Sequence, residues 1–396
     1  KYGLNKHVAT FVHCVDNSEY WKVDGNILID ARDRSTINSY VQAVSVAASF
    51  APTGAAVAIG VSVAENEINS TVTATVDRAV VEALGDITIT AFDLARIDTT
   101  STAAAMAIST GAGAAISGGG AYAYNTINTV TAAVVDRTGS VPVAGNPETG
   151  KTRLTTGKTL TVRAEGNAQA DALVVAAAAS FGAIAAAAAG TISINRLNPK
   201  VMASIRTAEI LASLSTGKVE VLALANQKAF ARSDALSVSS GASVGSSTVI
   251  ATDSGSVVAE LGDDVRVVAS VLRIHAKAQD DIYQRTSASS GGVFAGLAGS
   301  YSDLKIEGTT RAGLGDRNQI AVGLLDIWST RSQNFDAVAL NLAVGALAGS
   351  GAAMFTTLTG TSNVKIGQNS KVVAGNIAIR ADNMADKNRY SATEES

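Results

Sequence analysis

One short motif, apolar-x-apolar-x-Ala or a close variant, recurs along almost the whole chain. It usually follows a glycine, and its seven copies are separated by 52 to 73 residues. The copies begin at Ile27, Ile87, Leu160, Val219, Leu272, Leu325 and Ile377. Self-similarity at such a period is typical of repeat architectures, in which each unit buries its apolar surface against its neighbours.

The motif divides the chain into one continuous array rather than separate domains. We expect the array over 25–390, with units that start near 25, 85, 157, 217, 270, 323 and 375. Residues 1–24 are predicted to be an irregular lead-in or the end of a preceding repeat, and 391–396 a polar tail. An insertion at about 139–157 contains Pro142 and Pro147 and is predicted to be a surface loop.

Alternation with a period of two dominates wherever side chains are large enough to show it, as in TVTATVDRAVVEALGDITITA from Thr71. The chain is 47% apolar but only 5% aromatic, with 36 glycines, so its core must be built from small side chains packed repetitively. These features predict an all-β, elongated β-solenoid of about six to seven degenerate repeats. Each repeat could form one broad coil with long strands or two coils of about 26 residues, and strand rise alone does not choose.

The run DALVVAAAASFGAIAAAAAGTI, from Asp171, is the most ambiguous segment. It is long enough for a transmembrane helix, and alanine also favours a soluble helix. The equivalent part of the next unit reads DALSVSSGASVGSSTVIA, which is too rich in serine and glycine for either. Because units of one repeat share a backbone, we predict strand here and no transmembrane span.

A second motif carries pairs of asparagines that are three residues apart. We interpret them as turn residues that stack in successive coils through amide ladders, which is a structural role. These residues are Asn66, Asn69, Asn125, Asn128, Asn195 and Asn198.

Signatures of chemistry are absent from the sequence. It contains no G-x-S-x-G elbow, P-loop, H-E-x-x-H or EF-hand loop, and the histidines His7, His13 and His275 lack a metal-ligand spacing. We therefore predict no enzyme activity, cofactor or metal, and the residues that would bind a ligand stay unknown. Cys14 is the single cysteine, predicted to be buried, and excludes an internal disulfide. A net charge of -3 without a basic patch predicts no nucleic-acid partner.

One enzymatic alternative remains, because β-helices also serve as carbohydrate-active enzymes with carboxylates clustered in a groove. Acidic residues follow the recurring motif, but arginines such as Arg32 and Arg96 are mixed with them, which favours a solvated edge. The acidic residues are Asp30, Asp33, Asp93, Asp98, Asp280 and Asp281.

The pattern G-[DN]-[IV]-x-[IV]-x-A, an Ala/Ser/Gly-rich middle and then N-x-[IL]-N-x-x-V-x-A resembles the repeats of large bacterial surface adhesins. These are the filamentous-haemagglutinin-like and leukotoxin-like filamentous adhesins, and the likeness covers about residues 25–390. The resemblance implies a secreted bacterial protein at the cell surface, with an adhesive or structural role and no catalytic residues.

We accordingly expect a structural or adhesive segment of an extracellular fibre, which continues in a longer chain or joins other copies end to end. A host or cell-surface glycan or protein is the expected partner. A self-assembling filament subunit without an adhesive role is a second expectation.

Overall fold

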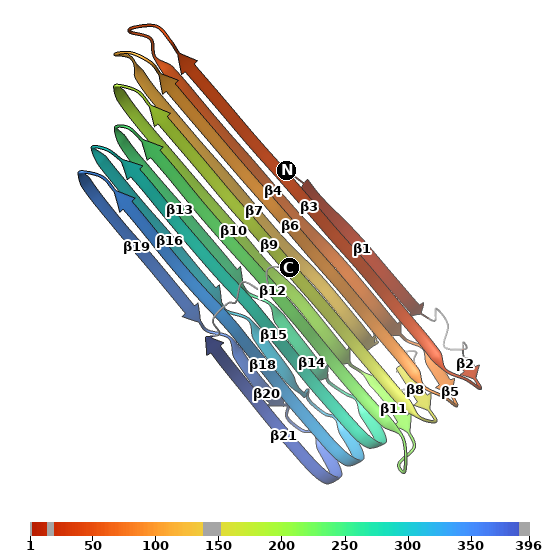
Figure 1. Ribbon diagram of the computed structural model, residues 1–396. Coiled ribbons are helices and arrows are strands. Elements are labelled where there is room, and N and C mark those ends of the chain that lie inside the picture. Colours follow the sequence, from red (N-terminus) through yellow and green to blue (C-terminus); the bar gives the residue numbers. More distant parts are fainter. Residues whose placement is uncertain (1, 14–19, 138–151, 388–396) are drawn as a thin grey trace.

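The computed structural model describes residues 2–13, 20–137 and 152–387. In these ranges the regular elements are strands, which form two sheets of parallel strands stacked face to face (Figure 1). The predicted all-β solenoid is therefore confirmed.

The first sheet has ten strands, with β1, β4, β7, β10, β13, β16 and β19 in this order and β14, β17 and β20 beside them. Their bounds are Tyr2–His13 (β1), Ala56–Asp77 (β4), Ala114–Asp136 (β7), Ile184–Ile205 (β10), Ala242–Asp253 (β13), Ser256–Leu261 (β14), Ala295–Ile306 (β16), Thr309–Leu314 (β17), Leu347–Leu358 (β19) and Thr361–Ile366 (β20).

The second sheet has eleven strands and contains the recurring motif. Its strands are Tyr20–Val23 (β2), Ile27–Ser49 (β3), Val80–Ala83 (β5), Ile87–Ser109 (β6), Thr152–Thr156 (β8), Thr159–Phe181 (β9), Ala208–Ala212 (β11), Lys218–Ser239 (β12), Arg266–Gly292 (β15), Gln319–Val344 (β18) and Lys371–Lys387 (β21).

Each repeat forms one broad coil, which answers the question of coil size. In one coil β6 runs along the second sheet, a short turn reverses the chain, β7 returns along the first sheet, and β8 leads into β9 beside β6. The seven motifs lie side by side in register, from Ile27 opposite Ile87 to Leu325 opposite Ile377. From β13 onward the returning strand is broken in two, at turns such as Ser254–Gly255.

The alanine-rich run forms the end of β9, a turn at Gly182 and Ala183, and the start of β10. It is strand, as predicted from the repeat context. In the part of the chain that the structure describes, no helix is long and apolar enough to cross a membrane.

The core changes in character along the strands. Near the recurring motif it consists largely of Ile, Val, Leu and Ala, such as Ile89, Leu160 and Val219. Near the turns that join the two sheets, a separate cluster of buried residues contains only alanine, including Ala58 and Ala107. We call the two regions the base and the tip.

Glycines bring the two sheets close together in the tip half. A Cβ atom on Gly60 would lie 2.6 Å from the carbonyl oxygen of Ala104 in the opposite sheet, and one on Gly119 would lie 2.5 Å from that of Ala177. Gly60 and Gly119 are neighbours in adjacent coils. The two sheets are therefore closer here than a side chain at either glycine position would allow. This close approach explains why the middle of each repeat uses such small residues.

One boundary differs from the prediction, and three expectations fall outside the described residues. Of the two alternatives for 1–24, the described part fits the end of a preceding repeat, because β1 pairs with β4 and β2 with β5. The predicted loop at about 139–157 ends too late, since β8 at Thr152–Thr156 pairs with β5 and β11. Its remaining residues up to 151, Cys14 and the tail at 391–396 lie outside the described ranges.

Candidate functional site

Two asparagine ladders cross the first sheet on its two faces. The predicted asparagines lie within β4, β7 and β10 rather than in turns, so this part of the interpretation was wrong. A separation of three residues in a strand places two side chains on opposite faces. The spacing therefore produces one ladder inside the solenoid and one outside it.

The inner ladder consists of Asn66, Asn125 and Asn195, all fully buried. Asn66 Nδ2 donates to Asn125 Oδ1 at 3.0 Å, and Asn125 Nδ2 donates to Asn195 Oδ1 at 3.0 Å. The Thr99 hydroxyl joins the ladder by donating to Asn125 Oδ1 at 2.7 Å. At the far end Asn195 Nδ2 donates to the carbonyl oxygens of Ala170 and Phe230, so the amide ladder also ties the first sheet to the second.

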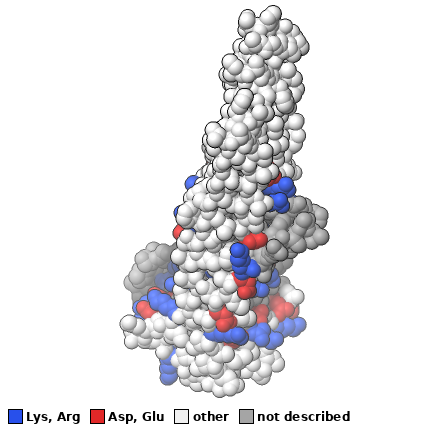
Figure 2. All heavy atoms as spheres, turned by 60° about the vertical axis from the view of Figure 1, so that its left-hand side comes forward, with Lys and Arg blue, Asp and Glu red and all other residues white. Residues whose placement is uncertain are grey.

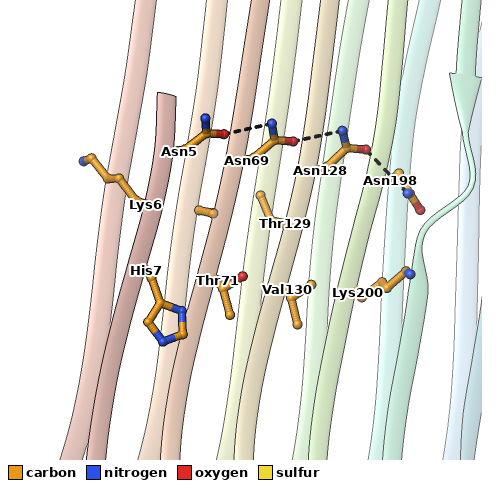
Figure 3. A pocket seen from close by; sticks show the side chains of 11 residues that line it. Asn5, Lys6, His7, Asn69, Thr71, Asn128, Thr129, Val130, Asn198 and Lys200 are labelled. Atoms are coloured by element: carbon orange, nitrogen blue, oxygen red, sulfur yellow. Dashed lines mark hydrogen bonds between the residues drawn. The ribbon is translucent and has the colours of Figure 1, made fainter. Parts of the chain in front are cut away.

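The outer ladder runs over the solvent-facing side of the same strands, and Asn5 of β1 extends it (Figure 3). Nδ2 donates to Oδ1 of the preceding coil from Asn69 to Asn5 (3.0 Å), from Asn128 to Asn69 (3.1 Å) and from Asn198 to Asn128 (3.5 Å). The sequence motif did not reveal Asn5, because no second asparagine three residues away accompanies it.

A shallow groove of about 440 Å³ lies beside the outer ladder. Lys6, His7 and Lys200 border it together with the amides and with hydroxyls such as that of Thr71 (Figure 3). Amides, hydroxyls and ammonium groups can hydrogen-bond a hydroxylated or anionic ligand. The residues that line this groove include no Asp or Glu, so it lacks the carboxylate pair that glycoside hydrolysis needs.

The acidic residues of the enzymatic alternative do not meet in one groove. Asp33, Asp93 and Asp280 point into the solenoid and are buried, whereas Asp30, Asp98 and Asp281 point outward. Adjacent residues such as Asp280 and Asp281 necessarily face opposite sides of a strand. The apparent cluster in the sequence is therefore divided between the interior and the outer surface.

Asp33 and Asp93 form a buried acidic pair across neighbouring coils. Ser70 donates to Asp93 at 2.8 Å, and the Lys6 ammonium lies 3.3 Å from Asp33. Burial raises the pKa of Asp93 to about 6, and the nearby Asp33 carboxylate also raises it, while the hydrogen bond from Ser70 opposes the shift. Asp33 and Asp93 are therefore structural groups of the interior.

A buried ionic cluster occupies the later coils and was missed at the sequence level. The fully buried Arg331 guanidinium lies 2.8 Å from Asp253 and 2.7 Å from Asp280. Burial raises the pKa of both carboxyl groups, and Arg331 opposes that shift. Gly308 makes room for the cluster, since a Cβ there would lie 2.1 Å from Arg331 Nη2. The three charged residues are 78 positions apart at most, so no local pattern announces them.

Of the three histidines, His275 has side-chain contacts within the described residues. His275 lies on the outer face of β15, where Nε2 is 2.9 Å from Asp326 and the ring packs edge-on against Trp328. Among the residues that the structure describes, no group of three or more His, Cys, Asp or Glu side chains could hold a metal ion.

No family model, no curated protein and no solved structure matches this chain. The resemblance to filamentous adhesins therefore stays a prediction.

Proposed function

We propose that the chain is a non-enzymatic structural and adhesive segment of an extracellular bacterial fibre, in which stacked coils supply length, rigidity and contact surface. The observation that carries this proposal is the continuous register of the coils. Seven copies of one motif lie in adjacent parallel strands, with two amide ladders along the same direction.

This arrangement suits a load-bearing role. Backbone hydrogen bonds between coils run along the stacking direction, and the inner and outer amide ladders add side-chain bonds with the same orientation. Stability in such an array is roughly a sum of contacts between neighbouring units, so added coils extend it without a new core.

The two outer edges of the stack are suited to pair with each other, which favours growth by further coils. On β21, Arg380 and Asp382 face outward as an ion pair at 2.7 Å. On β3, Asp30 and Arg32 form the reverse pair at 2.6 Å. A second copy that continues the register would place its Ile27 beside Ile377, and so its Asp30 beside Arg380 and its Arg32 beside Asp382. Opposite charges directly across a strand pair are stabilising, and like charges are destabilising.

An exchange of charged residues tests whether β21 of one copy pairs with β3 of the next, a contact that we call the joint. The double variant Arg380→Asp with Asp382→Arg keeps the net charge and the pair within the strand, but opposes like charges across the joint. We expect the concentration needed for end-to-end assembly, measured by analytical ultracentrifugation, to rise about five- to tenfold. Adding Asp30→Arg and Arg32→Asp should restore assembly. An unchanged assembly threshold in the double variant, or no recovery in the quadruple one, would rule out this joint.

The six acidic candidates for a carbohydrate-active enzyme do not form one active site. Glycoside hydrolysis needs a pair of carboxylates in one groove, and these six are divided between the interior and the outer faces. The groove beside the outer ladder instead offers amides and cations, which favour binding without catalysis.

A further inference from the structure

The tip half of the solenoid carries no charged side chain over a large part of its surface. Six stretches lack Asp, Glu, Lys, Arg and His, and each contains one of the turns that join the two sheets. They are 35–64, 99–135, 172–195, 235–252, 286–302 and 337–364. We call the part of the solenoid formed by these stretches, on the tip side of the charged residues, the uncharged lobe. In Figure 2 it is the narrow part of the molecule without blue or red atoms.

The larger apolar side chains in the first coil of this lobe point outward. On β4, Val57, Ile59, Val61 and Val63 are 54–66% exposed, while Ala58 and Ser62 between them are buried. In a protein surrounded by water the larger apolar residues face the core. An apolar exterior over a small or polar interior is instead the pattern of strands that face lipid.

The exposed apolar residues are found on both outer faces and on the turns. Val44 and Val46 lie on the outer face of the second sheet, opposite to the face formed by β4. The turns present Phe50 and Phe294, and Leu347 at the start of β19 lies beside them. A second copy packed against one sheet would cover only one of these surfaces, whereas lipid chains would surround all three.

Tyrosines lie at the border between the uncharged lobe and the charged base. The five are Tyr40, Tyr122, Tyr124, Tyr283 and Tyr301. On the second sheet, the register through Thr100 and Leu173 puts Tyr40 level with Arg232. On the first sheet, Tyr124 is level with Asp303 in the same way. Tyrosine at the junction of an apolar zone and a charged zone is typical of the interface between lipid and water.

The height of the lobe also suits a bilayer. From Asp171 to Phe181 the outer face of β9 rises ten residues, or about 33 Å, beyond its last charge. From Asp234 to the turn at Ser240 the rise is six residues, or about 20 Å. The hydrocarbon core is about 30 Å thick, so even the shorter value exceeds the depth of one leaflet.

Backbone groups in the turns at the tip are largely satisfied by neighbouring coils, which lipid contact requires. Thr110 N donates to the carbonyl oxygen of Ser49, Ser240 N to that of Ser180, and Leu347 N to that of Phe294. In the lobe, open backbone edges lie along β3 and β4 in the first coil and along β18 and β19 in the last. Lipid contact therefore concerns the outer faces and the turns.

From the apolar exterior, the tyrosine border and the matching height, we propose that the uncharged lobe enters the hydrocarbon region of a lipid bilayer tip first. The charged base then stays in water at the level of the headgroups. This proposal does not rest on the fibre function given above, because the apolar outer faces, the turns and the tyrosine border all belong to one chain.

Flotation of the full chain with phosphatidylcholine vesicles tests the proposal, since these lipids have no net charge to attract the base. The test variant is Ile59→Lys with Val61→Lys, and the matched control is Leu28→Lys in the base. Ile59 and Leu28 are both 66% exposed and Val61 is 61% exposed, so none of the three substitutions disturbs the core. We expect the unsubstituted chain to float with vesicles, the double variant to partition at least about tenfold less, and Leu28→Lys to stay within twofold.

A second measurement reports how deeply the uncharged lobe enters the bilayer. An environment-sensitive fluorophore attached at Val61→Cys, in a Cys14→Ser background, should be quenched by lipids with brominated acyl chains, while one at Leu28→Cys should not. Failure of the unsubstituted chain to float would overturn the proposal, as would an equal loss of flotation in the double variant and in Leu28→Lys. Vesicle-independent dimers that the double variant abolishes, without flotation, would identify a second copy as the occupant instead.

Discussion

At the scale of single residues, period-two geometry decides the role of each polar side chain. Asn125 and Asn128 lie three positions apart on β7 and make similar amide contacts, but one is buried and the other lies on the outer face. A buried amide that loses its partner leaves its neighbours unsatisfied, whereas water replaces a partner on the surface.

Substitution of these two asparagines gives a matched prediction. Asn125→Ala should lower the free energy of unfolding by about 2–4 kcal/mol, because the amides of Asn66 and Asn195 and the Thr99 hydroxyl lose a buried partner. Asn128→Ala should cost about 1 kcal/mol or less. Urea denaturation of both variants measures the difference, and equal costs would contradict separate inner and outer ladders.

Asp93 predicts a pH dependence. Since its pKa is about 6 in the folded chain and 3.8 ordinarily, the folded state holds its proton more tightly than the unfolded state does. The contribution is therefore fully favourable below pH 4 and is lost as the pH rises to about 6, which amounts to at most about 3 kcal/mol. Asp93→Asn should remove this loss.

The measurement is urea denaturation of both proteins at pH 3.5 and pH 8. The variant should gain free energy of unfolding relative to the unsubstituted chain at pH 8, but not at pH 3.5. A gain that is the same at both pH values would contradict a buried carboxyl with a raised pKa.

The sequence predicted the stacking of asparagines but not their location. A pair such as Asn66 and Asn69 was interpreted as a turn because asparagine commonly occupies turns. The long strands override that preference, since an amide that bonds to identical amides above and below is satisfied inside a sheet. The ion cluster around Arg331 could not be predicted, because its members come from three strands and depend on the coil register.

At the scale of strands and sheets, the repeat predicted the architecture well, because every motif copy occupies an equivalent strand. Coil size could not be predicted, since 53 residues fit one broad coil or two short coils equally well. The structure shows the broad coil, in which strands of 22 or 23 residues such as β4 and β6 reach from the base to the tip. Ala, Ser and Gly in the tip half allow this length, since they let the two sheets approach closely.

Two adjacent glycines on β7 test the close approach of the sheets. Gly119→Ala should destabilise the chain by about 1–3 kcal/mol, because the new methyl group would lie 2.5 Å from a backbone oxygen of the opposite sheet. Gly118→Ala points outward, where the nearest atom is 4.0 Å away, and should be neutral or slightly stabilising. Chemical denaturation compares them, and a neutral Gly119→Ala would contradict the tight tip.

At the scale of the whole molecule, the chain is polarised along its strands. The base combines a core rich in Ile, Val and Leu with charged outer faces, and the tip combines an alanine core with an uncharged exterior. The sequence already contained this division as alternating charged and uncharged stretches. The sequence alone did not show that these stretches form one surface, because only the stacked fold places the six of them side by side in one lobe.

The central claim is that copies of the chain stack end to end, so that the coils of one copy continue those of the next. Negative-stain electron microscopy of the purified chain over a concentration series tests it most directly. We predict filaments of constant width that lengthen with concentration, with a width set by strands of 23 residues, or about 75 Å. Compact particles of one size at every concentration would contradict end-to-end stacking and the fibre function that depends on it.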